Sequence, residues 1–467
     1  MRIEKDMLGE LELPEDSLYG IHSLRAKNNF ALDHKKTNPR LIRAIVTVKK
    51  AAALTWEGIE KEISRDGGRS KKFAAIASAC DTLLSQAGDS PLLTEAFITD
   101  ALQGGAGTST NMNVNEVLAN LALRTLGEKP GSYGVIHPLD DVNRGQSTND
   151  VYPTALRIAS ILLLRDLSDS CALLQEALQK KENEYDGIKK LGRTELMDAV
   201  PVTLGAEFGA YAQCIARDRW RLYKVEERLR QVNIGGAAVG RLDSADRERR
   251  ALQQKYQFGI IEKLRELTGI GLALSEYPMD ITQNNDVFVE ASGLLKALSV
   301  NLLKIAGDFR LMNSGPSGGI GEIRLAPVQA GSTAMPGKVN PVIAEMAMQA
   351  AIKVQANDYS VCAAASRGEF ELNAFLPLIA DALLESLCLL ERAVFLFRTR
   401  CVETLSPDTG RCKANLEAAS YFAAAYVPLL GYDAVSRAVA AGGGADEIRQ
   451  KLDSAVRAAA PQAVPPK

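Results

Sequence analysis

The sequence feature that most constrains the fold is a long apolar seam with helical spacing. Its members follow one another at alternating steps of three and four residues: Leu295, Leu298, Leu302, Ile305, Phe309 and Met312. This alternation places the side chains on one stripe of an α-helix that packs nearly parallel to its neighbours. The seam therefore predicts a long helix inside a bundle.

Three further apolar-rich segments each open with a proline, at Pro153, Pro341 and Pro377. Proline is common in the first turn of a helix. The segment after Pro153 is apolar almost all round, which is typical of a helix buried in a bundle core. Alternating β-branched runs are scarce. The sequence predicts an all-α (mainly α) fold with a central bundle of very long helices, and its apolar surfaces indicate a homo-oligomer.

The charge balance excludes several classes of partner. The 467 residues include 55 Lys+Arg and 57 Asp+Glu, which gives a net charge of −2. This argues against nucleic acid held by bulk electrostatics and against a polybasic membrane surface. No apolar run is long enough to cross a membrane, and the charged N-terminus does not resemble a secretory signal. Seven cysteines without a CxxC pair predict free thiols in a reducing cytoplasm.

Metal and cofactor motifs are not evident in the sequence. The three histidines, His22, His34 and His137, share no plausible ligand spacing, so a zinc site is not expected. There is no Walker loop, and no GxGxxG stands between a strand and a helix. We expect no cofactor.

The chemistry-bearing residues gather in loops rich in Gly and Pro. The segment 331–341 reads GSTAMPGKVNP and carries a hydroxyl, an ammonium and an amide. Lys338 and Asn340 can bind a carboxylate of an anionic substrate while Ser332 faces an acidic C–H group of the same molecule. A surface turn before a helix is the ordinary alternative for such a loop.

The loop 331–341 resembles the signature loop of the fumarase/aspartase superfamily. Three other strings are similar to active-site segments of the same family, and stand in the family's order: 104–116, 137–150 and 192–201. Matching features extend from residue 18 to residue 432, so the resemblance covers nearly the whole chain.

The resemblance implies a fold of three mainly helical domains. These are an N-terminal helical domain (1–145), a central long-helix bundle with the signature loop (146–402) and a small C-terminal helical domain (403–467). It also implies a homotetramer whose active sites are each shared by three subunits.

The resemblance further implies a reaction. The family removes a proton from the carbon beside a carboxylate and expels a nitrogen or oxygen group from the next carbon, usually leaving fumarate. The aci-carboxylate intermediate must be held by preorganised donors. Ser332 matches the general base, and the residues that match substrate-binding positions are Thr108, Ser147, Thr148, Asn149, Thr194, Lys338 and Asn340.

One string indicates the branch of the family. Residues 18–26, LYGIHSLRA, are nearer the aspartate ammonia-lyase pattern than the fumarate hydratase pattern. The implied reaction is anti elimination from L-aspartate to fumarate and ammonia, with a small dicarboxylate amino acid as substrate. Arg25 would position this substrate, although a surface arginine is the alternative, and His22 is taken as structural.

Two departures from the family pattern concern the substrate. Glu195 stands where fumarases and many relatives have histidine, and its matched partner is Glu345. Two neighbouring carboxylates share a proton or bind a cation, so Glu195 could donate to a substrate carboxylate or attract a cationic group. The second departure is Arg241-Leu242-Asp243-Ser244, where Arg241 could reach the site, followed by the charged run 245–250, read as a solvated face.

Three alternatives remain open from the sequence. The same chemistry could act on an N-substituted or N-oxidised aspartate, which Glu195 and Arg241 motivate. Fumarate hydratase is disfavoured, because expelling water needs an acid catalyst and the histidine is missing. Some members of the superfamily are structural lens proteins, but Ser332, Lys338 and Asn340 argue for catalysis here.

Overall fold

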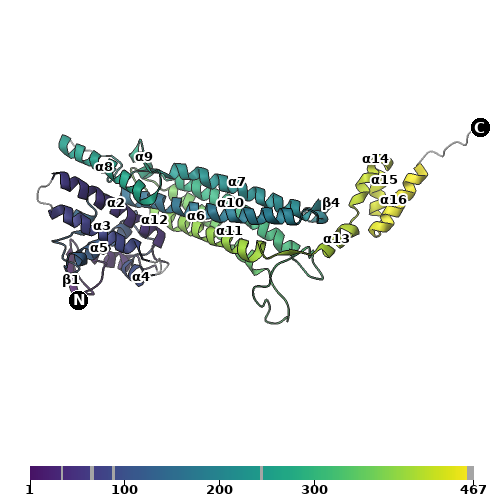
Figure 1. The fold of residues 1–467 in the computed structure, drawn as a ribbon, viewed down its shortest axis with the longest axis horizontal. Coiled ribbons are helices and arrows are strands. Elements are labelled where there is room, and N and C mark those ends of the chain that lie inside the picture. The colour runs from purple at the N-terminus through teal and green to yellow at the C-terminus, as the bar shows by residue number, and fades with distance from the viewer. Residues whose placement is uncertain (33–34, 64–67, 87–89, 242–245, 460–467) are drawn as a thin grey trace, which may run out of the picture. The chain divides into compact units, whose positions relative to one another are not determined.

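The structure is a computed structural model that describes residues 1–32, 35–63, 68–86, 90–241 and 246–459. The chain divides into two compact units. Unit 1 comprises Met1–Asp169, Arg219–Ser299 and Ile352–Glu391, and unit 2 comprises Ser170–Asp218, Val300–Ala351 and Arg392–Lys467. Long helices dominate both units (Figure 1), so the prediction of a mainly α fold is confirmed.

Five long helices each contribute residues to both units. They are α6 (Thr148–Glu184), α7 (Leu204–Leu229), α10 (Asp286–Met312), α11 (Val342–Ala365) and α12 (Leu376–Phe397). The predicted seam lies on α10, and all six of its side chains are buried. Helices α11 and α12 begin within one residue of Pro341 and Pro377, as predicted.

The predicted start of the helix at Pro153 is wrong, because α6 begins at Thr148 and Pro153 lies inside it. A proline inside a helix leaves the carbonyl four residues earlier without its backbone donor. Here that carbonyl belongs to Asn149, and it accepts a hydrogen bond from Asn233 Nδ2 at 3.0 Å instead. A side chain from a distant segment thus compensates for the proline.

Unit 1 is built on a layer of helices around α2. Its further elements are β1 (Arg2–Asp6), β2 (Gly9–Leu13), α1 (Ile21–Asn29), α2 (Pro39–Ile63), α3 (Gly68–Leu84), α4 (Pro91–Ala96), α5 (Thr108–Thr125), η1 (Pro138–Val142), β5 (Gln231–Val232), α8 (Arg247–Thr268), β6 (Ala273–Leu274) and α9 (Pro278–Gln283). Strands β1 and β2 form an antiparallel hairpin, and β5 pairs with β6 in parallel. Helix α2 packs against α3, α5 and α8.

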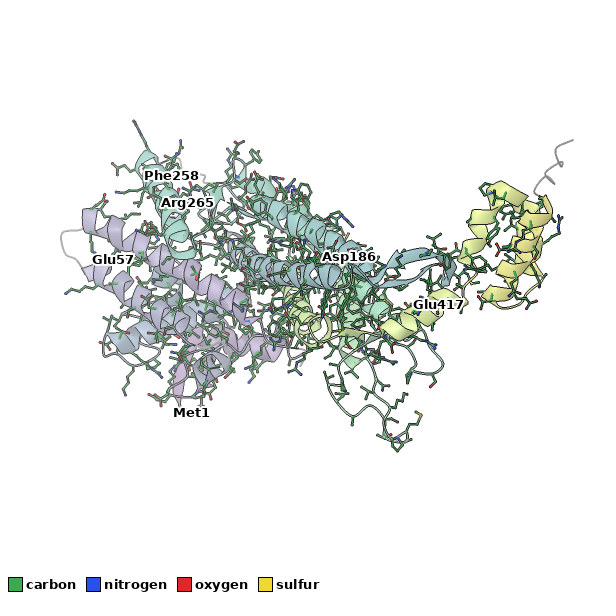
Figure 2. All side chains as sticks on the ribbon, turned by 45° about the vertical axis from the view of Figure 1, so that its right-hand side comes forward. Met1, Glu57, Asp186, Phe258, Arg265 and Glu417 are labelled. Carbon is green, nitrogen blue, oxygen red and sulfur yellow. The ribbon has the colours of Figure 1, made fainter. Side chains whose placement is uncertain are left out.

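Aromatic stacking joins three of these helices. Trp56 of α2 stacks on Tyr256 of α8 with ring centroids 4.9 Å apart, and on Phe73 of α3 at 6.4 Å. In Figure 2 the label Glu57 marks α2, and the labels Phe258 and Arg265 mark α8; the Trp56–Tyr256 stack joins these two helices. The rings therefore fix α2 between its neighbours.

Unit 2 contains an aromatic cluster and two antiparallel strand pairs. Its further elements are β3 (Lys189–Thr194), β4 (Met197–Thr203), β7 (Ile323–Arg324), η2 (Arg398–Val402), β8 (Ser406–Pro407), α13 (Thr409–Ala418), η3 (Tyr421–Tyr426), α14 (Val427–Leu430), α15 (Tyr432–Ala440) and α16 (Ala445–Ala459). Strands β3 and β4, and likewise β7 and β8, pair antiparallel. The ring of Phe309 on α10 lies 5.4 Å from both Phe208 of α7 and Phe397 of α12.

The last helices, at the yellow end of the chain in Figure 1, pack around a small apolar cluster of their own that includes Val435, Ile448 and Leu452. None of the seven cysteines forms a disulfide, as predicted. Within the described ranges, no helix combines the length and the apolar character needed to cross a membrane.

Candidate active site

The predicted site residues fall into two groups, one in each unit. Unit 1 holds Arg25, Thr108, Ser147, Thr148, Asn149 and Arg241, and unit 2 holds Thr194, Glu195, Ser332, Lys338, Asn340 and Glu345. Each group is described within its own unit.

In unit 1, Thr108 is the first residue of α5 and is half-buried. The residue before it, Gly107, has φ of +92°, and a Cβ there would lie 2.3 Å from the ring of Tyr152. Only glycine fits this position, and both the N–H and the hydroxyl of Thr108 donate to the carbonyl of Gly105, at 2.9 and 2.7 Å. The N-terminus of a helix favours negative charge, so this end suits a substrate carboxylate.

Ser147 caps the second such helix, α6, through a reciprocal pair of contacts. Its backbone N–H donates to Asp150 Oδ1 at 2.9 Å, and its Oγ accepts from the N–H of Asn149 at 3.2 Å. This is close to a capping box, except that the serine oxygen accepts from the second rather than the third residue of the helix. The other carboxylate oxygen of Asp150 accepts from the N–H groups of Gly235 and Ala237 at 3.0 and 3.1 Å, which fastens the cap to the Gly-rich loop 235–240.

Asn111 joins the starts of the two helices. Asn111 is on α5, three residues after Thr108, and its Nδ2 donates to Thr148 Oγ1 at 3.1 Å. The structure therefore brings the α5 and α6 N-termini into one cluster that contains the predicted hydroxyls. The side chain of Asn149 turns instead to the carbonyl of Ala238, to which its Nδ2 donates at 2.8 Å.

A buried lysine lies behind this cluster. Lys49 of α2 is fully buried, and its Nζ donates to Asn143 Oδ1 at 2.8 Å and to Gln146 Oε1 at 3.0 Å. Burial lowers the pKa of Lys49 to about 7, and burial raises the pKa of Asp150 to about 7 although three backbone N–H groups and the charge of Lys49 oppose the shift.

The sequence analysis assigned no role to Lys49, Asn111 or Asp150, although Asn111 and Asp150 stand in the strings 104–116 and 137–150. The Ser-x-x-Asp spacing of a capping box could have identified Asp150. No spacing rule links Lys49 to a loop so far along the chain.

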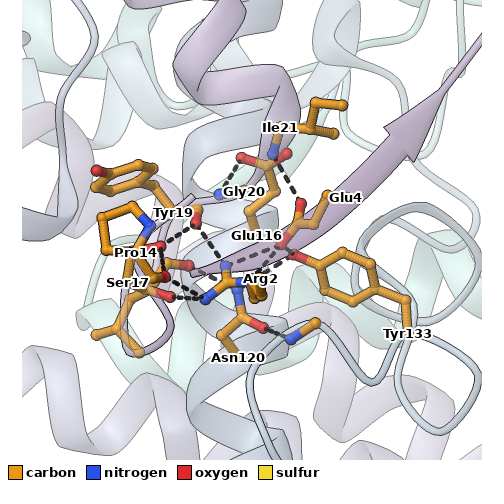
Figure 3. A network of polar contacts seen from close by, with 12 residues as sticks. Arg2, Glu4, Pro14, Ser17, Tyr19, Gly20, Ile21, Glu116, Asn120 and Tyr133 are labelled. Carbon is orange, nitrogen blue, oxygen red and sulfur yellow. Dashed lines mark hydrogen bonds and ion pairs between the residues drawn. The ribbon is translucent and has the colours of Figure 1, made fainter. Parts of the chain in front are cut away.

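The segment 18–26 is held on α5 by Glu116. The carboxylate of Glu116 accepts from the N–H groups of Gly20 and His22 at 2.8 and 2.9 Å, and also from Ser23. Figure 3 shows Glu116 and Glu4 side by side at the start of α1. A Cβ at Gly20 would lie 2.7 Å from Glu116 Oε1, so this close approach requires glycine.

Arg25 contacts the N-terminal hairpin. Its guanidinium forms two hydrogen bonds with Asp6, at 2.7 and 2.9 Å, and a third with the carbonyl of Gly9 at 3.1 Å. The Arg25 guanidinium lowers the pKa of Asp6. Within this chain Arg25 therefore stabilises the β1–β2 hairpin, and the substrate-positioning role stays a prediction.

In unit 2, Ser332 lies at the start of a turn in the loop 331–341. Its Oγ accepts from the N–H groups of Ala334 and Met335 at 3.2 and 2.8 Å. Two backbone donors aimed at one hydroxyl oxygen favour the anionic form of that oxygen. Ser332 is half-buried, so its oxygen remains reachable.

The same loop is closed by Asn340. Its Nδ2 donates to the carbonyl of Gly331 at 2.9 Å, which joins the two ends of the loop. A Cβ at Gly331 would lie 2.3 Å from the carbonyl oxygen of Lys338, so the crossing requires glycine. Lys338 is exposed, and the described residues offer its ammonium no hydrogen bond or ion pair. Its charge is thus available to an anion.

Thr194 and Glu195 lie at the tip of the β3–β4 hairpin. Thr194 pairs with Met197, which leaves Glu195 and Leu196 as a two-residue turn with φ of +53° and +66°. This is the conformation that tight hairpins select, although Asn and Gly are the usual residues there. Both side chains are exposed.

The base of this hairpin is anchored by buried charges. Glu322 is fully buried, and it pairs with Lys190 at 2.7 Å and with Arg193 at 2.9 Å. Glu322 directly precedes β7, from which the chain continues into the loop 331–341. One carboxylate therefore fixes the hairpin that carries Thr194 and Glu195 and the strand that leads to Ser332.

The predicted partner of Glu195 is engaged elsewhere in this chain. Glu345, in the first turn of α11, forms an ion pair with Arg310 of α10 at 3.5 Å. Between Glu195 and Glu345 the described residues show no hydrogen bond or ion pair, so their sharing of a proton stays a prediction.

Arg241 is exposed at the end of the loop 235–240, and the departure at Leu242–Ser244 lies outside the described residues. The following charged residues 246–250 are exposed, which confirms the reading of a solvated face. No set of three or more His, Cys, Asp or Glu side chains in the described ranges is arranged to hold a metal ion.

The arrangement suits an anionic substrate. Unit 1 offers two helix N-termini with hydroxyls, and unit 2 offers, in one loop, a serine oxygen that accepts two backbone hydrogen bonds and an exposed lysine ammonium. Donors at helix N-termini stabilise developing negative charge, and a serine anion removes a proton.

Comparisons with known proteins identify the family. Residues 9–356 match a family model described as lyase. An aspartate ammonia-lyase of Pseudomonas aeruginosa is 42% identical over 441 residues, which cover 93% of this chain and 89% of that protein. An aspartate ammonia-lyase of Bacillus subtilis is 39% identical over 436 residues, which cover 93% of this chain and 88% of that protein.

Solved structures agree with these relatives. The crystal structure of a fumarate lyase:delta crystallin from Brucella melitensis superimposes with a TM-score of 0.85 at 41% identity, covering 96% of this chain and 99% of that one. A class II fumarase from Schistosoma mansoni superimposes with a TM-score of 0.86 at 26% identity, covering 98% of this chain and 94% of that one. The chain therefore belongs to the fumarase/aspartase superfamily of lyases.

Proposed function

We propose that this chain is a carbon–nitrogen lyase that converts L-aspartate to fumarate and ammonia. The observation that carries the proposal is the pair of backbone donors on Ser332 Oγ, in a chain about 40% identical to aspartate ammonia-lyases over most of its length. A carbon acid beside a carboxylate needs such a base, because its proton is weakly acidic.

The reaction begins with the placement of the two carboxylates of aspartate. The carboxylate beside the reacting carbon lies at the N-termini of α5 and α6, where the hydroxyls of Ser147 and Thr148 donate to it. Thr108, whose hydroxyl donates to the carbonyl of Gly105 at 2.7 Å in this structure, gives up that bond to donate as well, and Asn149 contacts the substrate near them. The other carboxylate is held by Lys338 and Asn340, with Thr194 beside it. A charged donor that meets a carboxylate contributes about 1.5–3 kcal/mol.

The elimination itself takes two steps. Ser332, as the alkoxide, removes a proton from the carbon beside the first carboxylate, and the electron pair moves into that carboxylate to give an aci-carboxylate with two negative charges. The C–N bond on the opposite face then breaks, the electron pair returns to form the double bond, and ammonia leaves. The amine is already protonated in the substrate, so its departure requires no acid catalyst.

A homotetramer with active sites shared by three subunits completes the proposal. It is supported by large apolar side chains exposed on the long helices, among them Trp220 and Tyr223 of α7 and Tyr359 of α11. Leu196 and Met197 at the β3–β4 tip are also exposed. Large apolar side chains that are exposed on one chain are candidates for burial between subunits. Sedimentation equilibrium should give four chains per particle.

The proposal also includes the three helical domains (1–145, 146–402 and 403–467) and a cytoplasmic location. The seven free thiols are consistent with a reducing compartment.

A second candidate substrate is an N-substituted aspartate. It is favoured by the exposed carboxylate of Glu195 at the hairpin tip and by the exposed Arg241, since both can meet a larger amine. A panel of L-aspartate, L-malate and N-methyl-L-aspartate, with fumarate followed by its ultraviolet absorbance, tests both. Turnover of L-aspartate alone supports the proposal. Turnover of the N-methyl compound alone supports the second candidate, and turnover of L-malate alone contradicts both.

A further inference from the structure

We propose that Asn111 is a positioning residue that turns the hydroxyl proton of Thr148 toward the substrate carboxylate. The inference rests on the proposed function, in which Thr148 donates to the carboxylate that becomes the aci-carboxylate. A threonine hydroxyl can act as donor or acceptor, and the inference explains why that of Thr148 acts as a donor.

Lys49 is fully buried, and its Nζ donates to the side-chain oxygens of Asn143 and Gln146, whose amide nitrogens each face a backbone carbonyl, a group that only accepts. The atom of Asn143 that faces Lys49 Nζ at 2.8 Å must therefore be the carbonyl oxygen Oδ1. The amide nitrogen of Asn143 points the other way and donates to the carbonyl of Gln146 at 3.2 Å. The lysine and this carbonyl together remove the choice of orientation that an asparagine side chain usually has.

The orientation of Asn143 then fixes its neighbours on α5. Both Asn111 and Asn115 must present their NH₂ groups to the oxygen of Asn143, and they do so at 3.1 and 3.2 Å. The second hydrogen of the Asn111 amide therefore points to Thr148 Oγ1, at 3.1 Å. The side chain of Asn111 is almost fully buried, so water does not offer it an alternative set of partners.

The hydroxyl of Thr148 has a single hydrogen. Since its oxygen accepts from Asn111, that hydrogen is left to donate, and among the described residues no acceptor takes it. A carboxylate at the N-termini of α5 and α6 is the acceptor that fits. The relay from Lys49 through Asn143 and Asn111 thereby orients the Thr148 donor before the substrate binds, which is what stabilisation of developing charge requires.

The first test is Asn111→Asp, which keeps the shape and changes a donor into an acceptor. We expect kcat on L-aspartate to fall about 100-fold at pH 8, the size of effect seen when one oxyanion donor is lost. The loss should shrink as the pH is lowered and the new carboxyl takes a proton, which gives the variant a pH profile unlike that of wild type. Asn120→Asp is the matched control, because Asn120 is equally buried on α5 but bonds Leu18, Gly131 and Tyr133.

The second test is a double-mutant cycle with Thr148→Val. In wild type, Asn111→Ala should lower kcat about 10- to 100-fold, whereas in the Thr148→Val background it should cost less than about threefold, since it then has no hydroxyl to orient. Equal losses in both backgrounds overturn the proposal. The proposal is also overturned if kcat of Asn111→Asp depends on pH in the same way as kcat of wild type or of the Asn120→Asp control.

Calorimetric binding of fumarate separates this inference from the proposed function. The oriented hydroxyl should also donate to the carboxylate of bound fumarate, so Asn111→Asp should weaken fumarate binding about tenfold at pH 8 and Asn120→Asp should not. If the variants bind fumarate in this way but the wild-type protein does not turn over L-aspartate, the proposed function is contradicted and the role of Asn111 is supported. Fumarate binding that is equal in wild type and Asn111→Asp overturns the role of Asn111 even if aspartate is turned over.

Discussion

The hydroxyl oxygen of Ser332 lies 2.8 Å from the backbone nitrogen of Met335 and accepts its hydrogen bond. The N–H of Ala334 adds a second donor at 3.2 Å. Both donors belong to a loop whose two ends are joined by Asn340 and Gly331. A serine becomes a base only when its anion is stabilised, and this turn supplies that stabilisation from the backbone, where mutation of a side chain does not remove it.

Ser332→Ala removes the proposed general base. We expect turnover of L-aspartate to fall at least about 1,000-fold, because no other group takes the proton. The melting temperature should change by only a few degrees, since the hydroxyl is half-buried and caps one turn. Ser366→Ala, at an exposed serine on the surface, is the control and should keep full activity. A Ser332→Ala protein with wild-type turnover would exclude this serine as the base.

Lys338→Met should act on substrate binding. The ammonium of Lys338 is exposed and, in the described part of the chain, has no ionic partner, so removing it leaves the fold intact. We expect KM for L-aspartate to rise about 10- to 100-fold, the equivalent of one charge-assisted hydrogen bond. Steady-state kinetics measure this, and Lys71→Met on α3 is the control. An unchanged KM would mean that the substrate carboxylate does not bind Lys338.

Glu195→Gln distinguishes the two candidate substrates. If L-aspartate is the substrate, removing an exposed carboxylate at the hairpin tip should leave kcat within about threefold of wild type, because ammonia leaves without an acid. If an N-substituted aspartate is the substrate and Glu195 meets its amine, turnover of that compound should fall at least about tenfold. Parallel assays on both compounds decide between these outcomes.

The lowered pKa of Glu385 predicts that the stability of the folded protein depends on pH. Burial alone would raise the pKa of Glu385, but hydrogen bonds from Asn357, Lys353 and Lys35 outweigh it and lower the pKa to about 2. The carboxyl takes a proton near its usual pKa of 4.5 in the unfolded chain, so the stability that it contributes above pH 4.5 is lost as the pH falls toward 2.

Glu385→Gln should therefore be less stable than wild type at pH 7, by about 1–2 kcal/mol once solvent screening is counted. The difference should narrow when melting is measured at pH 3 to 4. Glu371→Gln, at an exposed position, serves as the control and should melt like wild type at both pH values. A gap between Glu385→Gln and wild type that stays constant over this range would contradict the linkage.

Much of the fold follows from helical periodicity. The seam from Leu295 to Met312 identified α10 because burial of one stripe is a local property of the sequence. Pro153 misled the same reasoning, because the group that compensates for it is Asn233, more than 70 residues away in the sequence. Local signals do not report such long-range partners.

The site residues also divide into those with a local sequence signal and those whose partners are distant in the sequence. The strings around Ser332, Thr108 and Thr148 could be found in the sequence because the family keeps them together. Lys49 could not, because its role depends on α2 packing against the loop that carries Asn143. The Glu195–Leu196 turn also gave no signal, since hairpin turns of this type usually contain Asn and Gly.

If Ser332 and its partners catalyse anti elimination of ammonia from L-aspartate, the protein must also catalyse the reverse addition with the same stereochemistry. The protein is incubated with fumarate and ammonium in D₂O, and the product is examined by proton NMR. We expect L-aspartate that carries one deuterium at the carbon beside the side-chain carboxylate, as a single diastereomer from anti addition. Deuterated malate, a mixture of diastereomers, or unchanged fumarate beside folded protein would contradict this mechanism.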